Sequence, residues 1–233
     1  MKKYTSEELK SIYSTNNDLI DRRMMFHNFC NQYNITSENI DKSRFITFTD
    51  DEITEIHTLA QGRYNNNRKN NTNQVKTGCG NPVGYLERDY PGVFGEKAFL
   101  KFLKEFKHKN LTNIDSIECS AKSNDTDEGD FIVPIGAENI KFEVKCNQFD
   151  PTHSSKKFLN VQYNQIQIMR EKRCKPHFFV QVIMVSPKIA YISGYADWFT
   201  VINGLCNADH GSYYRVPYDR IKYFSLNNIP EID

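Results

Sequence analysis

The run "HFFVQVIMV", residues 177–185, most limits what this chain can fold into. Its apolar residues follow one another with little polar alternation, which is typical of a strand covered on both faces. A second strand-like run, residues 188–195, follows soon after it. We therefore expect a sheet with packing layers on both sides, and 233 residues are enough for one core of this kind.

The other periodic segments surround that sheet with strands and helices. Short strand-like runs bounded by turn residues lie at 114–122, 130–135 and 139–146, and the aromatic tail at 212–226 is also extended. Helical spacing predicts a mainly helical segment at 5–60, including a helix that starts at a Thr49/Asp50 cap, an amphipathic helix at 94–108 and a helix at 155–173. The expected fold class is α/β, with one mixed sheet flanked by helices.

The order of these segments divides the chain into two parts that we expect to form one compact unit. Residues 1–93 are a helical N-terminal segment, and residues 94–233 hold the sheet and its helices. Within the first part, residues 62–84 contain no acid and are rich in Asn and Gly, which predicts a loop. A basic loop suits a nucleic-acid backbone, but a low-complexity surface insertion explains it equally well. The basic residues of this loop are Arg63, Arg68, Lys69 and Lys76.

Composition excludes several classes of protein. With 39% hydrophobic residues the chain is not a disordered tail, and a formal net charge of +1 leaves nucleic-acid binding to a local patch. The six cysteines form no CxxC or CxxH pair, so we expect no structural zinc and a reducing, intracellular location. No segment approaches the roughly 20 apolar residues of a membrane span, so we expect no membrane partner.

Charged residues interrupt the expected hairpin "GDFIVPIGAENIKFEVKC", residues 129–146. Alternation along its second strand places Glu143 and Lys145 on one face, while Asp130 opens its first strand. If the hairpin brings Asp130 near Glu143, two carboxylates share one site, and a hard divalent cation such as Mg²⁺ resolves their repulsion. Two carboxylates, a cation and a lysine suit phosphodiester hydrolysis. The alternative is an ordinary ion pair on a half-exposed strand, worth well under about 1 kcal/mol.

The pair Gly129-Asp130 followed by "FEVK" at 142–145 resembles the PD-(D/E)XK nuclease superfamily, which includes type II restriction endonucleases. Gly129 stands where the family name has proline. The resemblance covers roughly residues 94–194 and extends to the order of elements, which is a helix, a three-strand meander, a helix and a further strand. It implies a restriction-endonuclease-like core.

The resemblance also assigns roles to individual residues. It implies that Asp130, Glu143 and Lys145 are catalytic. It further implies a metal site formed by Asp130, Glu143 and the Val144 carbonyl, with Mg²⁺ as the metal and Mn²⁺ as a substitute.

Three more polar residues have a place in the family pattern. Glu96 lies on the apolar stripe of the expected 94–108 helix, so it faces the sheet, and many family members add an acid from this helix. The alternative for Glu96 is a favourable interaction with the helix dipole. Some relatives carry a glutamine in the helix after the (D/E)XK strand, and Gln162 and Gln165 are the candidates here. Either one is equally explained as a plain polar helix residue.

From these residues we expect a Mg²⁺-dependent endonuclease that cuts double-stranded DNA, similar to type II restriction endonucleases. Since one active site cuts one strand, we also expect a homodimer. A Holliday-junction resolvase, a repair or viral nuclease and an RNA endonuclease would use the same chemistry. The competing class is a non-catalytic nucleic-acid-binding protein that keeps the fold, although such a protein usually loses at least one charge of the site.

Overall fold

The structure is a computed structural model. It describes residues 44–69, 89–105, 130–135, 138–148, 158–171, 175–208, 211–217 and 220–221. The elements in chain order are β1 (Phe45–Thr47), α3 (Asp50–Lys69), α4 (Asp89–Glu105), β2 (Phe131–Ile135), β3 (Glu138–Gln148), β4 (Phe158–Gln162), α5 (Tyr163–Glu171), β5 (Phe178–Ser186), β6 (Ile189–Asp197), α6 (Trp198–Ile202), β7 (Leu205–Ala208) and β8 (Gly211–Pro217).

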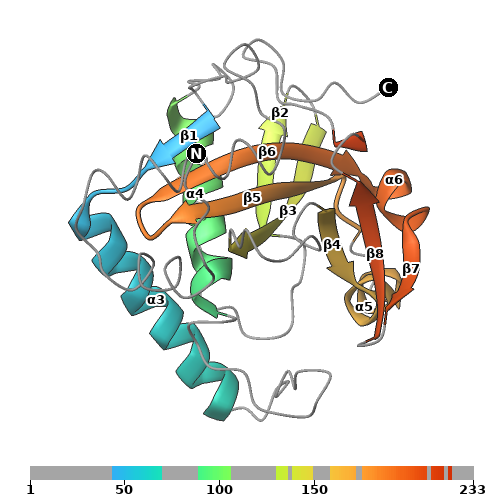
Figure 1. Ribbon diagram of the computed structural model, residues 1–233, viewed down its shortest axis with the longest axis horizontal. Coiled ribbons are helices and arrows are strands. Elements are labelled where there is room, and N and C mark those ends of the chain that lie inside the picture. The colour runs from blue at the N-terminus through green and yellow to red at the C-terminus, as the bar shows by residue number, and fades with distance from the viewer. Residues whose placement is uncertain are drawn as a thin grey trace, which may run out of the picture.

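A mixed five-stranded sheet forms the centre of the described structure (Figure 1). Its strand order is β1-β6-β5-β3-β2, in which β3 and β5 run parallel and all other neighbours run antiparallel. A parallel pair requires a crossover connection, and the chain makes it through β4 and α5. Every residue of β5 is buried, so the continuous apolar run does lie between two layers. The predicted combination of helices with a mixed sheet is confirmed, but the described strands form two sheets, whereas the sequence predicted one.

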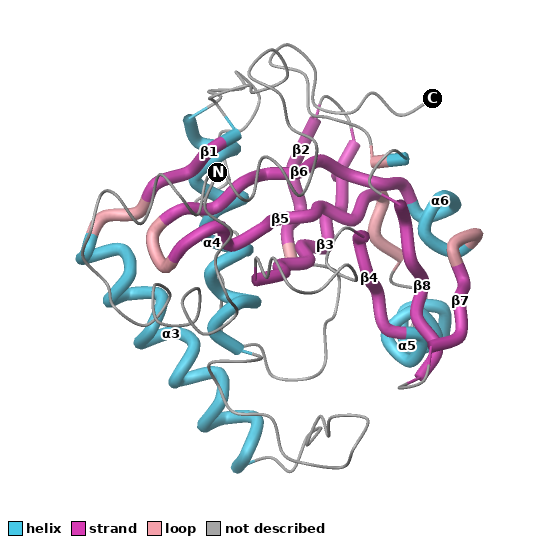
Figure 2. The backbone as a smooth tube through the Cα atoms, viewed as in Figure 1, coloured by secondary structure: helices cyan, strands magenta, loops and turns pink. Residues whose placement is uncertain are grey.

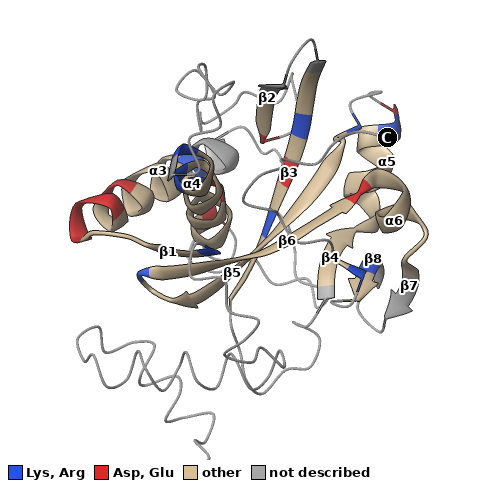
Figure 3. Cartoon of the chain, turned by 90° about the horizontal axis from the view of Figure 1, so that it is seen from above, with Lys and Arg blue, Asp and Glu red and all other residues tan. Residues whose placement is uncertain are grey.

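Two different layers cover the sheet (Figure 3). Helices α3 and α4 pack on one face, over a first core that includes Phe99 of α4 and Phe142 of β3. On the other face, a second core joins the sheet to α5, α6 and a three-stranded sheet of order β4-β8-β7 (Figure 2). Consecutive side chains of β5 serve different cores, since Phe178 and Val180 belong to the first and Phe179 to the second.

Helix α3 begins at the predicted cap and ends later than predicted. The Thr49 N–H donates to Glu52 Oε2 at 2.7 Å, and the Glu52 N–H donates back to Thr49 Oγ1 at 3.3 Å. The prediction of a loop from residue 62 is wrong for residues 62–69, which continue this helix. Asparagine is only a moderately poor helix former, and Gln61 Nε2 donates to Asn65 Oδ1 at 3.2 Å, one turn further on.

Helix α4 begins at Asp89 rather than at the predicted residue 94. The start was not predicted because Pro91 and Gly92 are usually signals against a helix. Proline is nevertheless tolerated in the first turn, because an N–H at that position would have no intrahelical acceptor. Glu96 therefore lies beyond the first turn. The helix dipole, which acts within that turn, does not account for its position.

Residues 158–162 form the strand β4, whereas the sequence predicted the first part of a helix. Leu159 and Val161 are fully buried in the second core, so the side chains alternate with the period of a strand. Pairing with β8 decides this conformation. Only the second part of the predicted helix is helical, as α5, and it buries Ile166 and Met169. The short elements β1, α6 and β7 were not predicted, because three to five residues carry too little periodicity.

Some predicted segments lie outside the described residues. These are the helical part before residue 44, the remainder of the 62–84 segment from residue 70 onward, and the strand at 114–122. Among the helices that the structure describes, none is long and apolar enough to cross a membrane.

Gly95 allows α4 to approach β3 closely. A Cβ atom at this position would lie 2.5 Å from Cys146 Cβ and 3.5 Å from Val144 Cγ1. We expect Gly95→Ala to destabilise the fold by about 1–3 kcal/mol, because helix and strand must move apart to admit the methyl group. Urea unfolding checks this, with Gly62→Ala on α3 as the matched control.

A Cβ atom at Gly62 meets nothing within 4 Å. Alanine at that position should therefore gain up to about 1 kcal/mol of helix propensity. Equal stabilisation by the two substitutions would contradict the close approach of α4 to β3.

Candidate active site

Asp130 immediately precedes the first residue of β2, and beyond it no described strand pairs with this edge of β3. Phe131 pairs with Phe142, so one further step of the antiparallel register places Asp130 across from Glu143. Asp130 Oδ2 accepts a hydrogen bond from the Val144 N–H at 2.6 Å. The Asp130 side chain therefore accepts a hydrogen bond from β3 just beyond the last backbone pair between β2 and β3. It lies beside Glu143.

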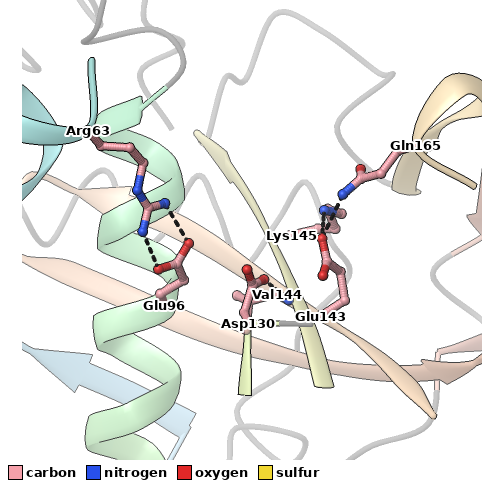
Figure 4. A network of polar contacts seen from close by, with 7 residues as sticks. All are labelled: Arg63, Glu96, Asp130, Glu143, Val144, Lys145 and Gln165. Atoms are coloured by element: carbon pink, nitrogen blue, oxygen red, sulfur yellow. Dashed lines mark hydrogen bonds and ion pairs between the residues drawn. The ribbon is translucent and has the colours of Figure 1, made fainter. Parts of the chain in front are cut away.

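Glu143 and Lys145 point to the face of the sheet opposite to α4. Their neighbours Phe142 and Val144 belong to the first core, as alternation along β3 requires. Lys145 Nζ donates to Glu143 Oε1 at 2.5 Å, and Gln165 Nε2 of α5 donates to the same oxygen at 2.7 Å (Figure 4). The Glu143 side chain is only 8% exposed. Two donors thus hold one buried carboxylate oxygen.

Glu96 approaches the same edge of the sheet from the α4 side. It is buried, and both of its carboxylate oxygens accept hydrogen bonds from Arg63, at 2.7 Å from Nη1 and 2.8 Å from Nη2 (Figure 4). Arg63 was predicted to lie in a loop, with nucleic-acid contact and a plain surface insertion as the alternatives. The prediction of a loop is wrong, because Arg63 lies in α3, where its guanidinium binds Glu96.

Among the described residues of this part of the molecule, negative charge exceeds positive charge, because three carboxylates lie near one ammonium and one guanidinium. Burial raises the pKa of Asp130 well above its usual range, and the carboxylates of Glu143 and Glu96 raise it further. The Lys145 ammonium and the backbone hydrogen bond oppose this rise in pKa only in part. For Lys145, burial would lower the pKa, but the neighbouring carboxylates outweigh it and raise the pKa. An additional cation would therefore be favourable beside Asp130.

The atoms offered to such a cation are oxygens, the ligands that Mg²⁺ prefers. In a strand the N–H and C=O of one residue point to the same edge, so the Val144 carbonyl faces the edge at which Asp130 accepts its hydrogen bond. Within the described ranges, no group of three or more His, Cys, Asp and Glu side chains is arranged to hold a metal. Arg63 donates to both carboxylate oxygens of Glu96. The described oxygen atoms that remain as candidate metal ligands are therefore those of Asp130, Glu143 and the Val144 carbonyl.

The structure separates the two candidate glutamines. Gln165 lies in α5 and reaches Glu143. Gln162 is exposed and is the last residue of β4, where it pairs with Tyr213 of β8, so its predicted place in a helix is wrong. Sequence spacing did not distinguish them, because β4 was not recognised as a strand.

We expect Gln165→Ala to reduce the rate of any reaction at this site by about 10- to 100-fold. The reason is that a hydrogen bond to a charged group contributes about 1.5–3 kcal/mol, and each 1.36 kcal/mol of barrier is a factor of ten. Gln162→Ala is the matched control and should leave the rate unchanged. A comparison of single-turnover rates for the two variants checks this. Equal rates would remove Gln165 from the site.

Arg68 and Lys69 fall within α3, and Lys76 lies outside the described residues. Cys146 packs against the first core as a small apolar side chain, and burial raises the pKa of its thiol to about 12. Trp198 is buried in the second core.

Comparison with known proteins finds no matching family model, no matching curated protein and no matching solved structure. The geometry of the described residues and the resemblance of the hairpin motif are therefore the indications of function.

Proposed function

We propose that this protein is a Mg²⁺-dependent endonuclease that hydrolyses phosphodiester bonds in double-stranded DNA. The observation that carries the proposal is the adjacency of Asp130, Glu143 and Lys145 where β2 begins and no further described strand pairs with this edge of β3. Asp130 stands opposite Glu143, and Lys145 Nζ contacts Glu143 at 2.5 Å. Two acids that would repel each other are thus held beside an ammonium, in a place where several oxygen ligands meet.

Each residue has a definite part in this proposal. Asp130, Glu143 and the Val144 carbonyl would hold the cation, since they present oxygen atoms at one edge. When bound, a divalent cation supplies charge stabilisation to a phosphoryl group and makes water a better nucleophile near neutral pH. Lys145 places its ammonium where it neutralises charge that develops on a phosphate. Gln165 orients Glu143 through their hydrogen bond at 2.7 Å.

The arrangement of elements supports a restriction-endonuclease-like core. Helix α4 precedes the β2–β3 hairpin, and β4 and α5 together connect β3 to the parallel strand β5. Apart from the additional strand β4, this agrees with the helix, strands, helix and strand that the PD-(D/E)XK resemblance implies. The first strand of that pattern, at 114–122, lies outside the described residues.

Incubation with supercoiled plasmid tests the proposal. We expect the full chain to nick or linearise plasmid DNA with Mg²⁺ or Mn²⁺, and to leave it intact with a chelator. Discrete fragments would identify sequence-specific cutting, preferential cleavage of four-way junctions would identify a resolvase, and cleavage of RNA alone would reassign the substrate. Absence of cleavage of every nucleic acid with both metals would overturn the proposal in favour of a non-catalytic binding protein.

A further inference from the structure

Arg63 and Glu96 connect α3 to the edge of the candidate site. The guanidinium of Arg63 binds both oxygens of Glu96, so the pair has the forked geometry that fixes a carboxylate in direction as well as in distance. A Cβ atom at Gly92, one turn before Glu96, would lie 3.7 Å from Arg63 Nη1. The guanidinium therefore lies along the surface of α4, between positions 92 and 96.

This pair differs from the other ion pairs between α3 and α4. Lys97 with Glu55, and Lys101 with Glu52, also join the two helices, but their acids are 56% and 35% exposed. The Glu96 side chain is 9% exposed. Exposed pairs contribute little to stability, whereas a carboxylate this buried needs a partner to remain where it is. Arg63 is therefore the group that keeps Glu96 inside the structure.

The position of Glu96 matters to the candidate site. Figure 4 shows its carboxylate on the α4 side of Asp130, with Glu143 and Lys145 on the other side. Gly95, the preceding residue, is where α4 comes closest to β3. Glu96 thus acts on the site from the opposite face of the sheet to Glu143. Each carboxylate oxygen that accepts one hydrogen bond from Arg63 retains a second acceptor position for water.

We propose that Arg63 is a positioning residue, whose guanidinium holds the Glu96 carboxylate beside Asp130 and thereby sets the affinity of the candidate site for a divalent cation. The inference depends on the proposed function for the existence of that cation site. It assigns Arg63 to the catalytic centre through Glu96, and not to a nucleic-acid backbone.

Titration of the full chain with Mn²⁺, followed by electron paramagnetic resonance of the free ion, tests this without any measurement of cleavage. We expect Arg63→Lys to weaken Mn²⁺ binding by about 10-fold or more, the usual effect of losing a group that orients a metal site from outside its ligands. Lysine keeps the positive charge but cannot form the fork. Lys97→Ala is the matched control, because it removes a neighbouring α3–α4 ion pair, and its Mn²⁺ affinity should equal that of the wild type.

Glu96→Gln tests the same ion pair by changing the carboxylate instead of the guanidinium. It replaces Arg63→Lys in the Mn²⁺ titration if circular dichroism shows that Arg63→Lys does not fold. It should weaken Mn²⁺ binding to a similar extent, and Arg63→Lys should then cause no further loss in the Glu96→Gln background. Unchanged or tighter Mn²⁺ binding by Arg63→Lys, or additive losses in the double variant, would overturn the inference.

The two proposals fail in different ways. A wild-type chain that binds Mn²⁺ with the expected dependence on Arg63, yet cleaves no nucleic acid, would refute the nuclease function and leave the positioning role intact. If the wild-type chain cleaves DNA but Arg63→Lys leaves its Mn²⁺ affinity unchanged, the nuclease function stands and the positioning role is refuted. A wild-type chain that binds no Mn²⁺ would overturn both.

Discussion

Lys145→Ala is expected to reduce plasmid cleavage by about 10²–10⁴-fold at saturating Mg²⁺, while DNA binding changes little. The range is that of a positioned acid–base or charge-stabilising group that acts mainly in the transition state. Lys145 is suited to this because it stands beside Glu143 at 2.5 Å, on a rigid strand whose neighbour β5 is wholly buried. Single-turnover cleavage and filter binding on the same preparation separate the two effects.

The control for this experiment is Lys104→Ala, which removes an exposed lysine near the end of α4. Its cleavage rate should match that of the wild type. Lys145→Ala also deprives the buried Glu143 of a partner, so a loss of stability is expected and folding must be verified by circular dichroism. Equal cutting by wild type and a folded Lys145→Ala would exclude Lys145 from the mechanism.

Asp130→Asn is expected to abolish cleavage and, in the absence of divalent metal, to raise the melting temperature. Asparagine still accepts the hydrogen bond from the Val144 N–H through Oδ1, but it removes a buried negative charge next to Glu143. The gain should be several degrees, since 1 kcal/mol corresponds to about 2–4 °C for a chain of this size. Scanning calorimetry at pH 7 with a chelator measures it.

The pH dependence of this effect has a definite sign. The folded pKa of Asp130 lies above its unfolded value, so protonated Asp130 is favoured in the folded state and its contribution to stability is lost as pH rises through the folded pKa. The advantage of Asp130→Asn over wild type should therefore be greatest near neutral pH and disappear below about pH 4, where Asp130 is protonated in both states. Asp51→Asn, at an exposed position in the first turn of α3, is the control and should change stability by no more than about 0.5 kcal/mol.

Added Mg²⁺ provides the second half of this test. Ligand binding to the folded state raises the melting temperature, so Mg²⁺ should stabilise wild type and have little effect on Asp130→Asn. Equal stabilisation of the two proteins by Mg²⁺, or a lower melting temperature for Asp130→Asn at pH 7 without metal, would contradict the assignment of Asp130 as a ligand held against its neighbours.

The hairpin shows why part of the site could be predicted. Alternation along "KFEVK" depends only on the period of a strand, so Glu143 and Lys145 had to share a face once β3 formed. The helix start at the predicted Thr49/Asp50 cap is likewise local, since the residues that exchange hydrogen bonds there, Thr49 and Glu52, are three apart in one helix. These inferences needed no knowledge of distant parts of the chain.

The hydrogen-bond partners of the site residues could not be predicted from local sequence patterns. The Arg63–Glu96 bond spans a sequence separation of 33, and no local pattern connects these positions. Gln165 and Gln162 fit the predicted helical spacing equally well. The segment at 158–162 is a strand because it pairs with β8, and Gln162 is exposed at the end of this strand. Packing decided these positions, since a short apolar segment takes the conformation that its neighbours can pair with or cover.

By itself, the sequence determined the buried central strand, the alternating charges of β3 and the helical face of α4, because each depends on the local period of the backbone. The tertiary structure alone decided where α3 continues past residue 62, which glutamine reaches Glu143 and which cation holds Glu96. The physical reason is that a buried carboxylate needs hydrogen-bond donors, and Glu96 and Glu143 receive donors from α3 and α5. The packing of helices and strands determines which donors come within reach.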